Sequence, residues 1–167
     1  MSDYFTHGLI MGFIYFQLVV LIIILSNILI LHSTRSKVKP DLFPSISILI
    51  PARNEERCIS GCIQSLLEQD YPTFEVIALD DQSSDGTLAI LEQIAATQSK
   101  LKVLKGTSPP EGISGKNWAC TQLAKQSQCD LMLFTDADTV FLPGSLRQIT
   151  STMVDQKADL LTGFPRQ

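Results

Sequence analysis

The 167-residue sequence lacks an excess of basic residues. It contains 13 Lys and Arg against 17 Asp and Glu, a formal net charge of −4 at pH 7. Proteins that bind duplex nucleic acid usually present a basic face to the phosphates. This charge balance therefore disfavours nucleic acid as a partner.

Histidine and cysteine are also scarce, with two of the former and four of the latter. His7 and His32 flank an apolar segment and have no partner at metal-ligand spacing. The cysteines are Cys58, Cys62, Cys120 and Cys129, and no C-x-x-C pair occurs. The sequence thus excludes a zinc site of the usual spacing and predicts buried, reduced thiols.

Charge is absent altogether from Gly8 to Leu31, a stretch of 24 residues. As a helix it would be about 36 Å long, enough to cross a hydrocarbon core of about 30 Å. A signal peptide is the alternative, but this stretch is longer than a typical signal core and no basic residue precedes it. We expect a short N-terminal segment (1–7) and a retained transmembrane anchor (8–32).

Basic residues follow this segment at once. Arg35, Lys37 and Lys39 lie after it, whereas the N-terminal side carries only Asp3. The positive-inside rule then predicts a single pass of the cell (inner) membrane, with the rest of the chain in the cytoplasm. Residues 33–44, which are polar and contain two prolines, are expected to be a juxtamembrane linker.

Beyond the linker, strand and helix patterns alternate. Strands are predicted at 45–50 (ended by Pro51), 74–79, 101–106, 131–135 and 158–163. Helices are predicted at 54–67, at 88–95 with Ser84 or Asp85 as cap, at 116–128, and from Pro143 onward. This alternation is typical of an α/β fold with a mostly parallel sheet flanked by helices.

Candidate ligand-binding residues, most of them charged, follow three of these strands. They are Pro51, Arg53 and Glu55 after the first, Asp80 and Asp81 after the second, and Asp136 and Asp138 after the fourth. Ligands of open parallel sheets bind beyond the carboxyl ends of the strands. Each set also has a simpler explanation: Asp80 and Asp81 could begin a turn, Glu55 could complement a helix dipole, and Asp136 and Asp138 could be acids of a surface loop.

Asp136 and Asp138 are the most informative pair. At about 6 Å and an effective dielectric near 20, their repulsion is on the order of 3 kcal/mol. Strand-like alternation would put both carboxylates on one side, with Ala137 pointing away. Such a pair suits Mg²⁺ or Mn²⁺. Lys116 could add positive charge for phosphates, or be a solvated surface lysine.

Four segments in order, SILIPARNEE, ALDDQSSDGT, GKNWA and FTDADT with LPGSL, resemble the inverting family 2 glycosyltransferases. The resemblance spans 45–167 and implies a GT-A fold that binds a nucleotide-diphospho-sugar. The PPEG-to-GKNWA stretch and the closing GFPRQ are most similar to membrane-anchored members that glycosylate lipids, such as the carotenoid- and hopanoid-associated enzymes.

The resemblance also implies roles for individual residues. Pro51, Arg53 and Glu55 would line the nucleotide pocket, and Asp81, with Asp80, would read the base, as expected for uridine. Asp138 would be the direct metal ligand, while Asp136 would contact the sugar and support the metal. Lys116 would lie near the diphosphate or the donor sugar.

One part of the family pattern is missing. Members use an acidic catalytic base downstream of the D-x-D motif, and here only Asp155 and Asp159 follow Asp138. We therefore expect 45–167 to be the incomplete, donor-binding part of an enzyme that transfers a sugar, from a UDP-sugar, to a lipid-like or polysaccharide acceptor.

The main alternative is a truncated, non-catalytic, membrane-tethered nucleotide-binding module. A dinucleotide-dependent dehydrogenase is disfavoured because no G-x-G-x-x-G follows the first strand. A nucleotidyltransferase is disfavoured because the glycine- and basic-rich loop expected at that point is missing.

Overall fold

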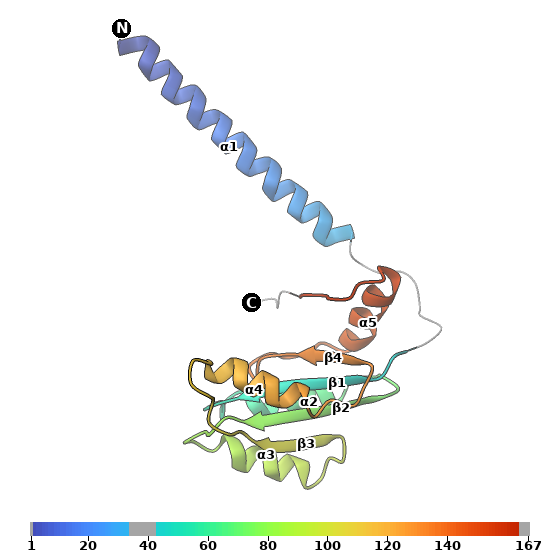
Figure 1. The fold of residues 1–167 in the computed structure, drawn as a ribbon. Helices are drawn as coiled ribbons and strands as arrows, with labels where there is room; N and C mark the ends of the chain where they lie inside the picture. The colour runs from blue at the N-terminus through green and yellow to red at the C-terminus, as the bar shows by residue number, and fades with distance from the viewer. Residues whose placement is uncertain (1, 34–42, 164–167) are drawn as a thin grey trace. The chain divides into compact units, whose positions relative to one another are not determined.

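A computed structural model describes residues 2–33 and 43–163. The chain divides into two units, Met1–Lys37 and Val38–Gln167, and each is described by itself (Figure 1). Most of the predicted linker and the last four residues of the chain lie outside the described residues.

The first unit is a single helix, α1 (Ser2–Ser33). Within it, Ile10–Asn27 is long and apolar enough to cross a membrane, and its large side chains are exposed. A signal sequence near an N-terminus would meet the same criterion. The transmembrane anchor therefore stays a prediction, although the helix itself begins earlier than the expected segment.

The second unit is built on a sheet of four parallel strands. They are β1 (Ile46–Ala52), β2 (Phe74–Asp80), β3 (Leu101–Lys105) and β4 (Leu131–Phe134), in the order β3-β2-β1-β4. The chain builds β1, β2 and β3 in one direction, then crosses to place β4 on the other side of β1 (Figure 1). This arrangement confirms the predicted α/β fold and creates a topological switch point between β1 and β4.

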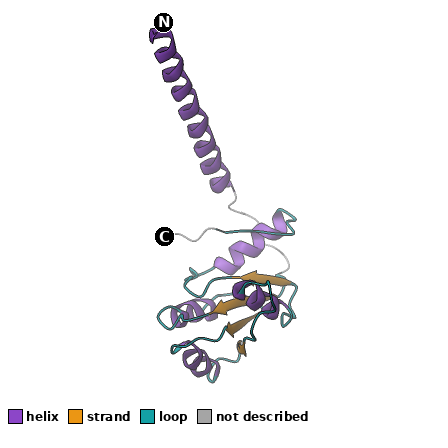
Figure 2. Ribbon diagram, turned by 60° about the vertical axis from the view of Figure 1, so that its left-hand side comes forward, coloured by secondary structure: helices purple, strands orange, loops and turns teal. Residues whose placement is uncertain are grey.

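Four helices accompany the sheet. They are α2 (Ile59–Leu67), α3 (Thr87–Ala95), α4 (Gly115–Ala124) and α5 (Ser145–Asp155) (Figure 2). Alternate residues of β1 face opposite sides: Ile48 and Ile50 join the core formed with α2 and α3. Leu49 instead packs in a second core with Leu123 of α4. Because both faces are covered, the central strands are almost entirely apolar.

Pro51 does not end β1, contrary to the sequence prediction. The strand runs one residue further, and Pro51 pairs in register with Leu79 of β2. The carbonyl of Leu49 accepts a bond from Thr135 on the β4 side, and Pro51 faces that same side, beyond the last β1–β4 pair. Its missing N–H therefore removes no ladder hydrogen bond.

Helix α2 begins at Ile59, so the prediction that it opens at Asn54 is wrong. Asn54 has a φ of 58°, a left-handed conformation that a right-handed helix cannot contain. Glu55 and Glu56 thus lie in the loop, and no acidic residue occupies the first turn of α2. The Glu55 carbonyl accepts from the Ile59 N–H at 2.9 Å, so Glu55 lies just ahead of α2, and the interaction of its carboxylate with the helix dipole stays a prediction.

Other predicted boundaries also shift. Gly144 has a φ of 81°, so α5 begins at Ser145 rather than at Pro143. Gly86 is the residue before α3, although Asp85 does accept a bond from the Thr87 N–H. The predicted helix 116–128 ends at Ala124.

The fifth strand predicted at 158–163 is wrong. Those residues form no strand, and Leu160 is 86% exposed, so the apolar run does not mark a buried strand. The thiol prediction holds for Cys62, which is buried, but not for Cys58, which is exposed, or for the half-buried Cys120 and Cys129. All four cysteines are free.

Gly106 allows the chain after β3 to approach the end of β2. A Cβ there would lie 2.8 Å from Leu79 Cδ2 and 3.1 Å from the Asp80 carbonyl oxygen. We expect Gly106→Ala to lower the free energy of unfolding by about 1–3 kcal/mol. Gly61→Ala is the control, because its Cβ would meet nothing within 4 Å in helix α2. It should raise stability by up to about 1 kcal/mol.

Urea unfolding of the full chain in detergent, followed by the fluorescence of Trp118, the sole tryptophan, would measure both changes. Equal effects of the two substitutions would contradict the close approach.

Candidate functional site

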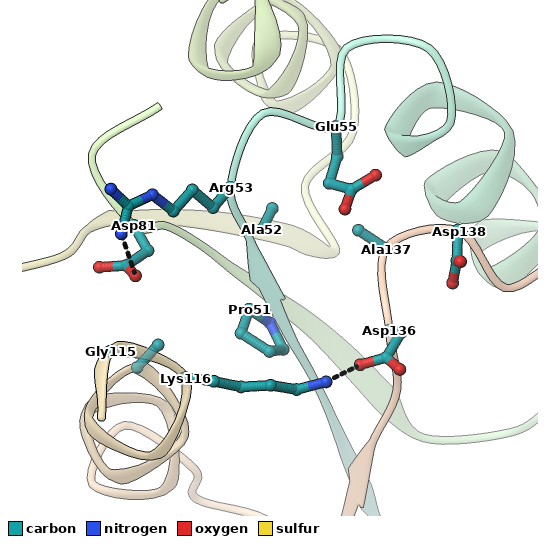
Figure 3. Close-up of a pocket in the computed structure, with 11 residues that line it drawn as sticks. Pro51, Ala52, Arg53, Glu55, Asp81, Gly115, Lys116, Asp136, Ala137 and Asp138 are labelled. Atoms are coloured by element: carbon teal, nitrogen blue, oxygen red, sulfur yellow. Dashed lines mark hydrogen bonds and ion pairs between the residues drawn. The ribbon is translucent and has the colours of Figure 1, made fainter. Parts of the chain in front are cut away.

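The carboxyl ends of β1, β2 and β4 surround an open cleft of about 410 Å³ (Figure 3). Its lining consists of Pro51, Ala52, Arg53, Glu55, Asp81, Gly115, Lys116, Ala119, Asp136, Ala137 and Asp138. The cleft lies at the switch point between β1 and β4, where an open α/β sheet binds its ligands. Every site residue predicted from the sequence lines it except Asp80.

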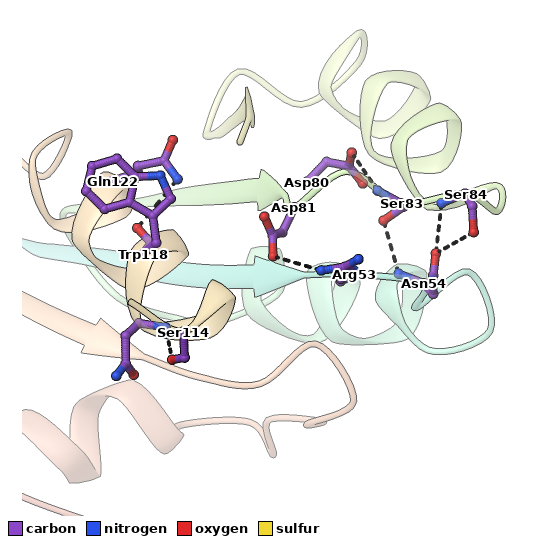
Figure 4. A network of polar contacts seen from close by, with 10 residues as sticks. Arg53, Asn54, Asp80, Asp81, Ser83, Ser84, Ser114, Trp118 and Gln122 are labelled. Atoms are coloured by element: carbon purple, nitrogen blue, oxygen red, sulfur yellow. Dashed lines mark hydrogen bonds and ion pairs between the residues drawn. The ribbon is translucent and has the colours of Figure 1, made fainter. Parts of the chain in front are cut away.

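Asn54 turns the segment after β1 toward the segment after β2 (Figure 4). Its backbone N–H donates to Ser83 Oγ at 3.0 Å, and its side-chain Oδ1 accepts from the Ser84 N–H at 2.8 Å. The left-handed backbone of Asn54 is one that asparagine tolerates better than most residues. These bonds fix the backbone between Arg53 and Glu55, which both line the cleft.

The same two segments are joined further along. The Glu55 N–H donates to Thr87 Oγ1 at 2.8 Å, and the Glu56 N–H donates to Asp85 Oδ2 at 3.2 Å. Glu56 Oε2 in turn accepts from the Gly86 N–H at 2.9 Å. The sequence predicts a turn at SSDGT but not these contacts, since no periodic pattern links two loops 30 residues apart.

Asp81 presents a largely buried carboxylate at one end of the cleft. Its side chain is 8% exposed, and its Oδ2 lies 3.8 Å from Arg53 Nη1. A Cβ on Gly115 would lie 3.4 Å from the same Oδ2, so the glycine leaves space beside this carboxylate. Asp81 therefore has an acceptor oxygen that a ligand N–H can reach.

Asp80 has a different position. Its Oδ2 accepts from the Ser83 N–H at 3.3 Å, which supports the turn after β2 (Figure 4). Its Oδ1 is buried without a hydrogen-bond partner among the described residues. The structure thus separates the two aspartates, and only Asp81 reaches the cleft.

Lys116 and Asp136 face each other across the cleft, one from α4 and the other from the segment after β4 (Figure 3). Lys116 Nζ lies 2.7 Å from Asp136 Oδ1, and the two side chains are 66% and 61% exposed. The hydrogen bond to Asp136, and then its charge, raise the pKa of Lys116. Since solvent screens so exposed a pair, it stabilises the fold little and is free to exchange partners.

Asp136, Ala137 and Asp138 form a turn rather than the predicted extended segment. The Thr139 N–H donates to the Asp136 carbonyl at 3.3 Å and closes it. Ala137 is 3% exposed and belongs to the core under α2, whereas both aspartates are exposed at the cleft. As predicted, the two carboxylates point away from Ala137. A turn anchored by the buried Ala137 methyl group, rather than an extended strand, produces this arrangement.

The negative charge of this turn affects a buried thiol, that of Cys62. Cys62 lies in the core beneath the turn, and its pKa is raised to about 12, first by burial and then by the charge of Asp138. Its Sγ donates to the Asp136 carbonyl at 3.7 Å.

Among residues 2–33 and 43–163, no group of three or more His, Cys, Asp or Glu side chains could hold a metal ion. The cleft offers the oxygens of Asp136 and Asp138, and these are hard ligands. Mg²⁺ is commonly held by one or two carboxylates together with substrate phosphates. The donor set fits a divalent cation that arrives with a diphosphate. Asp155 and Asp159, the remaining acids after the turn, do not line the cleft.

The parallel sheet with a cleft at the carboxyl ends of its strands is the arrangement in which open α/β folds bind their ligands. Residues 47–167 match the family described as Glycosyl transferase family 2, and the chain belongs to that family. The predicted family and fold are confirmed.

Two relatives illustrate the family. The chain is 38% identical over 97 residues to the beta-monoglucosyldiacylglycerol synthase of Trichormus variabilis, a match that covers 57% of the chain and 20% of that enzyme. It is 38% identical over 96 residues to the 4,4'-diaponeurosporenoate glycosyltransferase of Staphylococcus haemolyticus, covering 56% and 24%. The matched stretch thus spans about a fifth to a quarter of these relatives.

Solved structures agree on the fold. The mannosyltransferase PcManGT of Pyrobaculum calidifontis, in complex with GDP-Man and Mn²⁺, matches with a TM-score of 0.62 at 24% identity, covering 70% of this chain and 34% of that one. TarS of Staphylococcus aureus in complex with UDP-GlcNAc matches with a TM-score of 0.53 at 28% identity, covering 68% and 32%.

The Asn54 bend generates a prediction. Asn54→Ala removes the side-chain bond to Ser84 and places alanine, which is strained at positive φ, in this conformation. The substitution should lower the free energy of unfolding by about 1–3 kcal/mol. Asn54→Gly loses only the side-chain bonds and should lose less. Urea unfolding would rank wild type above Gly and Gly above Ala. An alanine variant as stable as the glycine variant would argue against strain at this position.

The Lys116–Asp136 ion pair leads to a prediction about the pKa of Lys116. Asp136→Asn removes the hydrogen-bonded charge that raises the pKa of Lys116, so that pKa should fall toward its ordinary value. An NMR titration of lysine side-chain ¹⁵N resonances would measure it. Asp159→Asn, an exposed change outside the cleft, should leave the pKa of Lys116 unaltered.

Proposed function

We propose that this chain supplies the donor-binding part of a glycosyltransferase that uses a nucleoside-diphosphate sugar, specifically a UDP-sugar, together with Mg²⁺ or Mn²⁺. The whole protein transfers the sugar with inversion to a lipid or polysaccharide acceptor at the cytoplasmic face of the membrane. The observation behind the proposal is that Asp81, Lys116 and the Asp136–Asp138 turn line one cleft at the switch point.

The nucleotide end is proposed to lie at Asp81. A buried carboxylate accepts hydrogen bonds only, and a uracil ring offers an N–H that suits it. Arg53 lies beside it and can contact the nucleotide, while Pro51 and Glu55 line the same cleft. The structural likeness to TarS, which binds UDP-GlcNAc, supports a UDP donor.

The diphosphate and sugar are proposed to lie between α4 and the D-A-D turn. Asp138 would hold the cation, with Asp136 in support and in contact with the sugar. Lys116 can leave Asp136 for a phosphate oxygen because both side chains are exposed. The cation, when bound, supplies Lewis-acid stabilisation of the departing diphosphate.

The acceptor is proposed from the relatives. One is named for glucosyldiacylglycerol synthesis and another for diaponeurosporenoate glycosylation. The apolar span Ile10–Asn27 would keep the protein at a membrane, where lipid acceptors are concentrated.

Transfer with inversion requires a general base, such as an ionised Asp or Glu carboxylate, that takes the proton of the acceptor hydroxyl. The two acids that follow the D-A-D turn do not line the cleft. For the residues described, the geometry therefore also supports a second candidate: a membrane-tethered module that binds the donor without transferring the sugar.

Calorimetry of UDP with the full chain in detergent, with and without Mn²⁺, tests the proposal. We expect Mn²⁺ to strengthen UDP binding in the wild type, and Asp138→Asn to remove most of that gain, about 10-fold or more. Asp159→Asn, the same chemical change outside the cleft, should keep it. If Mn²⁺ strengthens UDP binding to Asp138→Asn as much as to the wild type, the assignment of Asp138 as metal ligand is refuted. If Mn²⁺ does not change the affinity of the wild type for UDP, the metal-dependent donor site is refuted.

A further inference from the structure

Helix α2 and the residues just after it present a polar strip to the segment that carries the cleft carboxylates. Cys62 and Ser65 lie three residues apart on one face of α2, and Gln69 follows the end of the helix at Leu67. None of them lines the cleft. Their contacts therefore do not serve a ligand directly.

All three side chains bond to the backbone between β4 and the first turn of α5. Cys62 Sγ contacts the Asp136 carbonyl at 3.7 Å, and Ser65 Oγ accepts from the Phe141 N–H at 3.0 Å. Gln69 makes the two outermost contacts: its Nε2 donates to the Leu142 carbonyl at 3.0 Å, and its Oε1 accepts from the Leu146 N–H at 3.3 Å.

This segment depends on such partners because residues 135–144 form neither strand nor helix. Its backbone groups must find bonds outside a regular ladder. Gln69 is 6% exposed, and a buried amide in such a place is costly unless its bonds are satisfied. Here both ends of the amide are used, so it holds the segment in a defined position.

Helix α2 also follows directly from the loop that bears Arg53 and Glu55. The two walls of the cleft at the switch point are thus attached to the same helix. Carboxylates that share a cation with a diphosphate must be placed within a few tenths of an ångström, and groups behind the ligands set that placement.

We infer that Gln69 and Ser65 are positioning residues for the Asp136–Asp138 turn, acting through the backbone between residues 136 and 146. The inference rests on the proposed donor site. If so, substitutions in this strip should reduce the gain in UDP affinity that the cation provides. They should not change the contacts of the nucleotide with Asp81.

The test compares Gln69→Met, which keeps the side-chain volume but neither hydrogen bond, with Gln64→Met on the exposed face of α2. Dissociation constants for UDP are measured on the full chain in detergent, with and without Mn²⁺. We expect Gln69→Met to reduce the Mn²⁺-dependent gain about 10-fold while the Mn²⁺-free constant stays within about 2-fold of wild type. Gln64→Met should change neither.

Ser65 supplies a second, milder pair of variants. Ser65→Ala loses the acceptor of the Phe141 N–H and should lower the Mn²⁺-dependent gain, whereas Ser65→Thr keeps the hydroxyl and should restore it. Equal weakening of UDP binding with and without Mn²⁺ in Gln69→Met and Ser65→Ala would mean a general structural role and would overturn the inference.

The two proposals fail in different ways. If the wild type shows the Mn²⁺ effect and both Gln69→Met and Ser65→Ala retain it in full, the positioning role falls and the donor site stands. If the wild type shows no Mn²⁺ effect, both fall together.

Discussion

The cleft depends on hydrogen bonds between two loops that are about 30 residues apart in the chain. Asn54 bends the segment after β1 into a left-handed conformation, and its side chain and backbone bond to Ser84 and Ser83. Thr87, at the start of α3, continues the contact through the Glu55 N–H. The pairing of β1 with β2 brings the two loops side by side, since Ala52 is in register with Asp80 and its carbonyl accepts from the Asp81 N–H. Arg53 Nη1 and Asp81 Oδ2 then lie 3.8 Å apart, and the Asn54 and Thr87 bonds fix the loop beyond them.

The opposite wall is held by different means. The D-A-D turn rests on the buried methyl group of Ala137, with Cys62 beneath it and the polar face of α2 beside it. This arrangement exposes two carboxylates at one edge, and Lys116 partly offsets their repulsion from across the cleft. We therefore propose that this wall receives a ligand that brings positive charge with it, such as a diphosphate accompanied by a divalent cation.

The strands could be predicted from sequence because buried parallel strands are short, β-branched and apolar, as in SISILI and FEVIAL. The rule that ligands bind beyond the carboxyl ends of parallel strands then identified the cleft residues. The prediction for Asp80 was wrong, since strand alternation alone does not show which of two adjacent aspartates faces a ligand. It also missed Gln69 and Ser84, whose partners lie far away in sequence. The Asn54 bend and the absence of a strand at 158–163 follow from tertiary contacts, which local pattern does not record.

We propose that one cleft holds both the base of a uridine nucleotide and a cation shared with its diphosphate. The decisive test is diffraction from crystals of the full chain grown with UDP and Mn²⁺, with data at a wavelength where manganese scatters anomalously. We expect a manganese peak bonded to an Asp138 oxygen and to the diphosphate, with the uracil ring beside Asp81. A nucleotide bound elsewhere on the domain, or a manganese peak remote from the D-A-D turn, would contradict it.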